Sequence, residues 1–129
     1  MLIVGLVLAG LAALLHIFIF YLESIAWTSP RARATFGTTP EEAAATKQLA
    51  FNQGFYNLFL AIAVLLGIGF VVAGSLAVGA TLVFVGAGSM VAASLVLLLS
   101  SRDQAAAALK QGMLPLLGVA ALAIALLVS

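Results

Sequence analysis

The sequence predicts an all-α integral membrane protein built as one four-helix bundle, and three observations support this fold class. Of the 129 residues, 65% are hydrophobic and only 7% are charged, whereas a soluble domain carries about 25% charged residues. The apolar residues fall into four segments, each close to the ~20 residues that a helix needs to cross a bilayer. These segments show no strict polar alternation and are longer than the ~10-residue strands of a membrane barrel.

The four helices are expected to extend beyond the apolar segments into the flanking loops. We place them at about residues 2–27, 40–72, 76–99 and 102–128. Helices satisfy their backbone hydrogen bonds internally, as a lipid environment requires. Since we find no internal repeat, residues 1–129 are predicted to form a single transmembrane domain.

The start of the chain and the first loop determine the expected ends of the first helix. Met1–Val4 lacks the basic stretch that precedes the apolar core of a signal peptide, so this segment is expected to remain as a membrane helix. Ser29 precedes Pro30, which disfavours helical backbone at Ser29 and should end the helix there.

The second helix is expected to begin in the loop, before it enters the membrane. Thr39 can cap it, Pro40 suits its first turn, and Glu42 stands where it completes a capping box. Ser101 and Gln104 have the same spacing ahead of the fourth helix. We therefore expect a capped start for both helices.

The third helix follows a short turn at residues 73–75, and the fourth helix contains a proline. Because Pro115 has no N–H, the carbonyl of Gln111 is left without its usual helical partner. Gln111 is therefore expected to offer both a free backbone carbonyl and an amide side chain at the same position.

The distribution of basic residues predicts how the protein is oriented. All five basic residues lie in two loops or their flanks, one between the first two apolar segments and one between the last two: Arg31, Arg33, Lys47, Arg102 and Lys110. By the positive-inside rule both of these loops are cytoplasmic. The bundle is then up-down-up-down, with the N-terminus and the C-terminus on the same, non-cytoplasmic side.

The composition also excludes several kinds of chemistry. The chain has no cysteine, so disulfides, thiolate nucleophiles and cysteine-ligated metals are ruled out. A formal net charge of +1 gives no electrostatic reason to expect nucleic acid as a partner. One histidine and one nearby acid do not make a metal site, so neither a metal nor a cofactor is expected. The expected partners are the lipid bilayer and a small apolar or lipid-like ligand, and a homo-oligomer is left open.

One face of the first helix combines small and polar residues. Gly5, Ala9, His16 and Glu23 follow steps of three and four and so share a stripe, whose small residues favour close approach of a neighbouring helix. At ~1.5 Å per residue, His16 lies about 10 Å and Asn57 about 7 Å inside the expected cytoplasmic boundary. These two side chains should therefore share one layer of the bundle.

Polar side chains are costly in hydrocarbon, so their concentration in the cytoplasmic half predicts a site. The candidate catalytic residues are His16, a proton donor or acceptor near neutral pH, and Glu23, its electrostatic partner. The candidate ligand-binding residues are Asn52, Gln53, Tyr56, Asn57 and Gln111. Together they predict a cytoplasm-facing pocket within the membrane that binds, or acts by acid–base chemistry on, a small apolar or amphipathic molecule.

Two other functions stay open, and the sequence does not decide whether the protein is an enzyme. As a proton-coupled transporter or exporter, the protein would use the same polar ring to line an access route. As a structural or interaction protein, it would use the polar side chains only to fix helix register. In that case the polar groups should satisfy one another and leave no cavity.

Individual residues also have simpler interpretations. Glu23 would be an ordinary interfacial acid if it paired with Arg31 or Arg33. Trp27 and Tyr56 would be aromatic residues of the membrane interface.

The polar residues also resemble a known pattern. The resemblance rests on His16, Tyr21-Leu22-Glu23, Trp27, Asn52-Gln53-Gly54-Phe55-Tyr56-Asn57, Gln111-Gly112 and Pro115. These residues resemble the pattern of domain-of-unknown-function family 1304, a group of small four-helix bacterial membrane proteins, over essentially the whole chain. The resemblance implies this architecture and a location in the cell inner (plasma) membrane, but it implies no particular activity.

Overall fold

A computed structural model describes all 129 residues. It contains helices and no strand. Four helices are long and apolar enough to cross a membrane: α1 (Leu2–Phe20), α4 (Lys47–Val72), α5 (Leu76–Ser100) and α6 (Ala105–Leu127). The predicted all-α membrane bundle of four helices is therefore confirmed.

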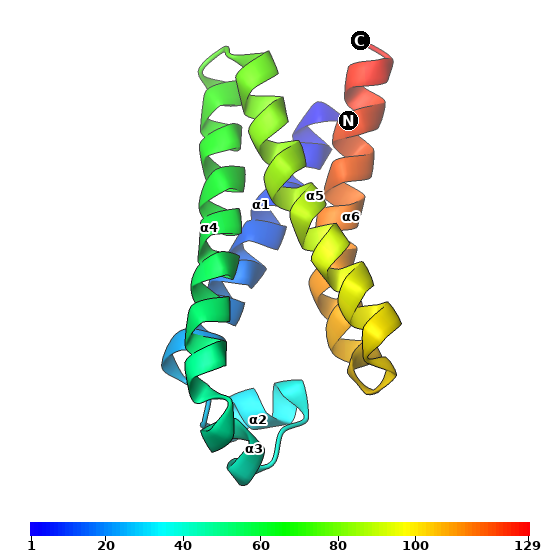
Figure 1. Ribbon diagram of the computed structural model, residues 1–129. Helices are drawn as coiled ribbons and strands as arrows, with labels where there is room; N and C mark the ends of the chain where they lie inside the picture. The colour runs from blue at the N-terminus through cyan, green and yellow to red at the C-terminus, as the bar shows by residue number, and fades with distance from the viewer.

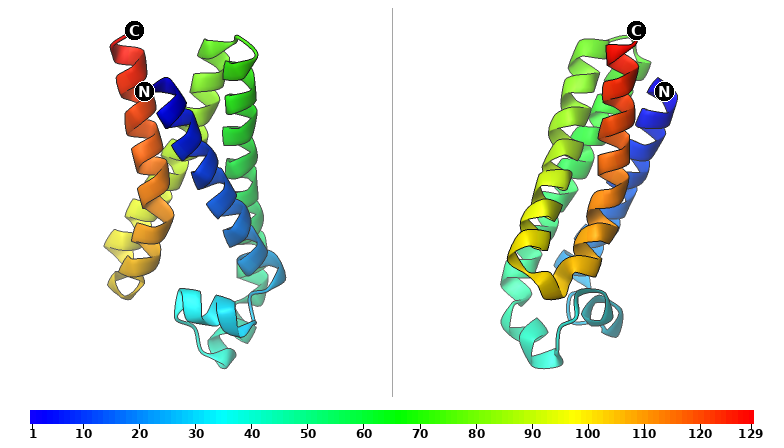
Figure 2. Two further views of the ribbon diagram at one scale, coloured as in Figure 1. Left: turned by 180° about the vertical axis from the view of Figure 1, so that it is seen from behind. Right: turned by 90° about the vertical axis from the view of Figure 1, so that its right-hand side faces the viewer.

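The four long helices alternate in direction, and both chain ends lie at the same end of the bundle (Figure 1). Each helix packs against two neighbours, in the cyclic order α1, α4, α5, α6. Two further views show the same arrangement, with α1 beside α6 and α4 beside α5 (Figure 2). The side of the membrane on which the termini lie stays a prediction.

Glycine residues bring the helices into close contact near the end that holds the termini. A Cβ atom added to Gly79 of α5 would lie 2.5 Å from the carbonyl oxygen of Gly67 in α4. A Cβ added to Gly5 of α1 would lie 2.8 Å from the backbone nitrogen of Leu122 in α6. Small residues therefore allow backbone to pack directly on backbone, as the stripe in the first helix indicated for that helix.

The other end of the bundle is wider and carries the charged loops (Figure 1). Here α1 continues into a π-helical turn, η1 (Tyr21–Ile25), and the chain then forms two short helices, α2 (Pro30–Phe36) and α3 (Pro40–Ala45). The structure thus differs from one continuous helix over 2–27, and α2 was not expected from the sequence. Buried contacts among Ile19, Leu22, Ala32 and Phe36 hold α2 against α1.

The two expected capping boxes have different outcomes. Thr39 Oγ1 accepts a hydrogen bond from the Glu42 N–H at 3.1 Å, and Glu42 Oε1 accepts one from the Thr39 N–H at 3.0 Å, so the first box is confirmed. The second is wrong, because Ser101 makes no side-chain cap. Residues Arg102–Gln104 instead form a 3-10 turn, η2, before α6 begins, and Gln104 Nε2 donates to the carbonyl of Phe36 at 2.9 Å.

Packing between α4 and α5 gives a first testable prediction. We expect Gly79→Ala to destabilise the protein by about 1–3 kcal/mol, because the added methyl group meets backbone that cannot move aside. Gly88→Ala is the matched control on the same helix, since nothing lies within 4 Å of its added Cβ. Unfolding of both variants in detergent is measured by circular dichroism. Equal unfolding free energies would contradict the close packing of α4 on α5.

The capping box of α3 gives a second prediction. Hydrogen bonds from the Thr39 backbone N–H, and then from its side chain, lower the pKa of Glu42 below its ordinary value of 4.5. Because the folded-state pKa is depressed, the capping contribution to stability is complete above 4.5 and is lost as pH falls through the folded pKa. Thr39→Ala should raise the pKa of Glu42 measured by NMR. Thr35→Ala is the control and should not change this pKa, because the Thr35 hydroxyl donates to the carbonyl of Arg31.

Candidate functional site

A cavity of about 560 Å³ lies between the long helices at the end that carries the charged loops. At this end α1 and α4 diverge from α5 and α6, and α2 lies beneath the opening (Figure 1). The polar wall consists of His16, Glu23, Gln53, Asn57 and Gln111. The apolar wall, from α5, consists of Met90, Ala93, Val96 and Leu97, and Trp27, Phe36, Thr38, Ser100 and Gln104 complete the lining.

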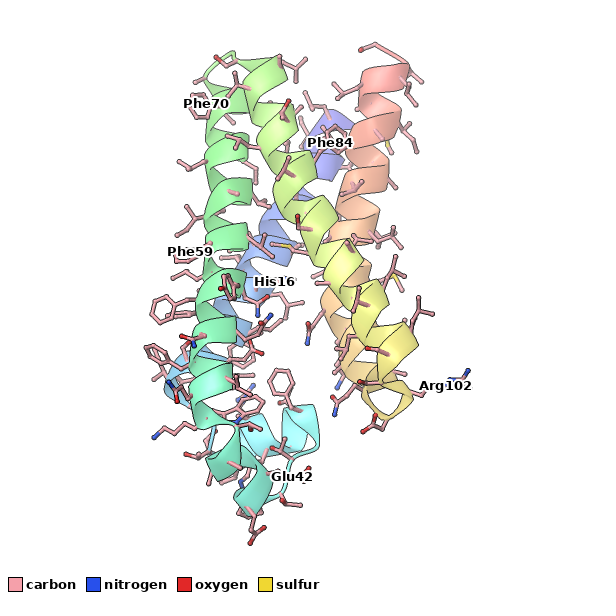
Figure 3. The ribbon with its side chains drawn as sticks, viewed as in Figure 1. His16, Glu42, Phe59, Phe70, Phe84 and Arg102 are labelled. Carbon is pink, nitrogen blue, oxygen red and sulfur yellow. The ribbon has the colours of Figure 1, made fainter.

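His16 lies on the buried face of α1, where it is 2% exposed. Its Nδ1 atom is 2.9 Å from the carbonyl oxygen of Ala12, one turn earlier. A carbonyl can only accept, so Nδ1 carries the hydrogen and Nε2 is left as an acceptor while the ring is neutral. Figure 3 shows this side chain within the bundle, between α4 and α5. His16 therefore presents one free acceptor to the cavity that it lines.

Glu23 lies in the π-helical turn η1 and is joined to helix α4. Asn57 Nδ2 donates to Glu23 Oε1 at 2.6 Å and to the carbonyl of Gln53 at 3.3 Å. Arg31 and Arg33 make other contacts: Arg31 lies 5.2 Å from the ring centre of Phe18, and Arg33 Nε donates to a loop carbonyl. The alternative in which Glu23 pairs with one of these arginines is thus not what the structure contains.

A close contact between η1 and α4 keeps Glu23 and Asn57 together. A Cβ atom added to Gly54 of α4 would meet the side chain of Ser24 and would lie 3.0 Å from its backbone nitrogen. Ser24 Oγ in turn donates to the carbonyl of Phe51 at 2.7 Å. The absence of a side chain at Gly54 therefore lets the π-helical turn approach α4.

Two of the candidate ligand-binding residues do not line the cavity. Asn52 is exposed, and Tyr56 is 62% exposed. Both line an adjoining hollow of about 570 Å³, which shares Glu23, Trp27 and other residues with the cavity. Their contribution to ligand binding stays a prediction, as do the roles of the residues on the cavity wall.

The structure also adds residues that the sequence analysis did not place at the site. Trp27 Nε1 donates to Thr46 Oγ1 at 3.1 Å, and the Trp27 side chain lines the cavity. The sequence analysis had interpreted this tryptophan as an aromatic residue of the membrane interface. Thr38 Oγ1 is buried without a hydrogen-bond partner. No sequence signal marks Thr38 or Gln104, because α2 and η2 bring them to the cavity from loops. Trp27, by contrast, falls on the same stripe as His16 and Glu23.

The fold defines the class of this protein: a multi-pass integral membrane protein built as a bundle of four helices. Residues 10–123 match the family described as Protein of unknown function (DUF1304). The chain therefore belongs to this family, and the resemblance seen in the sequence is confirmed. No curated protein and no solved structure matches the chain with significance.

The hydrogen bond between Asn57 and Glu23 gives a third prediction. In a double-mutant cycle, Glu23→Ala and Asn57→Ala should show a coupling of about 0.5–2 kcal/mol in unfolding free energy, the range for hydrogen bonds between membrane helices. Asn52→Ala is the control, because it removes an amide from the same helix that does not bond Glu23. If the effects of Glu23→Ala and Asn57→Ala on the unfolding free energy are additive, the hydrogen bond between the two residues contributes nothing to stability.

Proposed function

We propose that this protein binds a small apolar or amphipathic molecule in the cavity and acts on it by acid–base chemistry. The observation that carries the proposal is that polar side chains from α1, η1, α4 and α6 line one cavity whose opposite wall, on α5, is mostly apolar. The volume of about 560 Å³ is within the range of roughly 300–1,000 Å³ for small-molecule sites. A site with one polar wall and one apolar wall suits a molecule that has a polar head.

In this proposal His16 transfers the proton. Its neutral ring offers Nε2 as an acceptor, and its buried position on α1 fixes the direction of that atom. Glu23, on the same wall, would stabilise the imidazolium that forms, and Gln53, Asn57 and Gln111 would orient the ligand. Suitable reactions are isomerisation, cyclisation or hydration of a lipid-like molecule, in which Nε2 first takes a proton from the molecule or from water and the imidazolium then returns it to another atom.

The cavity is proposed to open toward the cytoplasm, in the inner membrane of the cell. The positive-inside rule supports this orientation, because all five basic residues lie in the two loops at the cavity end or in the adjoining ends of α4 and α6. Asn52 and Tyr56, in the adjoining hollow, would then contact the ligand near its point of access. A molecule could reach them from either the bilayer or the cytoplasm.

Two features argue against a purely structural role for the polar residues. Such a role requires polar groups that satisfy one another and leave no space. His16 Nε2 and Thr38 Oγ1 have no hydrogen-bond partner in the protein. A cavity of about 560 Å³ separates the polar wall from α5, where register-fixing contacts would have to be made.

Proton-coupled transport is a second candidate, and one observation favours it. The bundle is closed by glycine contacts at one end and has its cavity at the other, as expected for a transporter open to one side. Substrate flux in proteoliposomes that depends on a pH gradient would distinguish transport from catalysis.

The proposed function gives a fourth prediction. Native mass spectrometry of the protein released directly from its membrane should detect a bound small molecule that His16→Ala and Asn57→Ala lose. Thr81→Val is the control, because Thr81 is exposed on α5 and does not line the cavity. Folded His16→Ala and Asn57→Ala proteins that retain the same molecule, or full biological activity, would exclude the proposal.

A further inference from the structure

We infer that the ligand of this cavity is a lipophilic organic amine, which binds as an ammonium ion with its apolar tail against α5. The inference rests on the proposed function, in that the cavity is taken as the binding site. It adds the chemical class of the ligand. The hydrogen-bonding groups of the cavity wall and the charge of that wall give two separate arguments for this class.

Three of the five side chains of the polar wall, His16, Glu23 and Asn57, offer hydrogen-bond acceptors to the cavity, whereas Gln53 and Gln111 carry both donors and acceptors. Asn57 uses its Nδ2 group on Glu23 and on the carbonyl of Gln53, so its free atom is the acceptor Oδ1. His16 uses Nδ1 on Ala12 and keeps Nε2 as an acceptor. Glu23, when ionised, only accepts, and Asn57 is the one side chain that bonds it. A ligand that satisfies all three groups must donate several hydrogen bonds, as an ammonium group does.

The charge of the cavity wall points to the same class. Glu23 is the one acidic or basic side chain that lines the cavity apart from His16, and none of the five basic residues does so. An anionic ligand would meet a carboxylate with no cation to balance it. A neutral ligand would leave an ionised Glu23, which is partly buried, without a counter-ion among the residues that line the cavity. An ammonium head group supplies both the counter-ion and the missing donors.

The other walls fit the rest of such a molecule. Trp27 and Phe36 lie at the cavity with ring centres 5.2 Å apart, and the faces of aromatic rings attract cations. Met90, Ala93, Val96 and Leu97 of α5 give an apolar surface opposite the polar wall. An alkyl or aryl tail can lie on this surface while the head group contacts Glu23.

The test compares three probes that share one tail: octylamine, 1-octanol and octanoate. The protein is placed in phosphatidylcholine vesicles, and binding is followed by the fluorescence of Trp27, which is the single tryptophan of the chain and lines the cavity. Partitioning of each probe into protein-free vesicles is measured first, so that affinities refer to equal concentrations in the bilayer.

We expect octylamine to bind about tenfold or more tightly than 1-octanol, because it adds charge-assisted hydrogen bonds. Glu23→Gln, which keeps an acceptor for Asn57, should reduce this preference to about twofold or less. Glu41→Gln is the control, because Glu41 is an exposed acid of α3 that does not line the cavity, and it should keep the preference. Circular dichroism establishes that each variant is folded.

The other outcomes separate this inference from the proposed function. If 1-octanol or octanoate binds as tightly as octylamine, and His16→Ala and Asn57→Ala weaken that binding, the amine class is overturned while the binding site stands. A preference for octylamine that persists in Glu23→Gln also overturns the inference. If no probe alters Trp27 emission, the inference fails, and retention of the native molecule in mass spectrometry decides the proposed function independently.

Discussion

Hydrocarbon cannot solvate polar groups, and this constraint accounts for most of what is found in the structure. Backbone groups meet it by forming four long helices. Two polar side chains within the spans meet it by bonding inside the bundle: His16 bonds the carbonyl of its own helix, and Asn57 bonds Glu23 of the preceding span. Large aliphatic residues such as Ile3 and Leu99 are left exposed on the outside, where lipid surrounds them.

The two ends of the bundle differ in which elements their glycine contacts join. Near the termini, Gly5, Gly67, Gly79 and Gly118 let the backbones of neighbouring helices come into contact. Toward the charged loops, the glycine contacts instead join η1 to α4 at Gly54 and α6 to α5 at Gly112, and α5 and α6 separate from α1 and α4. The cavity follows from this separation of the helices, and α2 lies beneath it as a consequence of the turn at η1.

Much of this organisation could be predicted from the sequence, whereas several residues of the site could not. Hydropathy predicted the spans, and helical spacing put His16 on the inner face of α1, because both depend on neighbours close in the chain. The inward position of Asn57 followed from the cost of polar groups in lipid. Tyr56, its immediate neighbour, was expected to share the site but lies outside the cavity, since helical rotation of about 100° per residue separates adjacent side chains.

The sequence by itself determined that this protein is a membrane-spanning four-helix bundle of its family, with small and polar residues on the inner faces. Tertiary structure decided which polar groups meet. Glu23 bonds Asn57 instead of an arginine because a π-helical turn, allowed to approach α4 by Gly54, sets the direction of its side chain. Thr38 and Gln104 reach the cavity through loops. Such placements depend on contacts between distant segments, which periodicity along one helix does not encode.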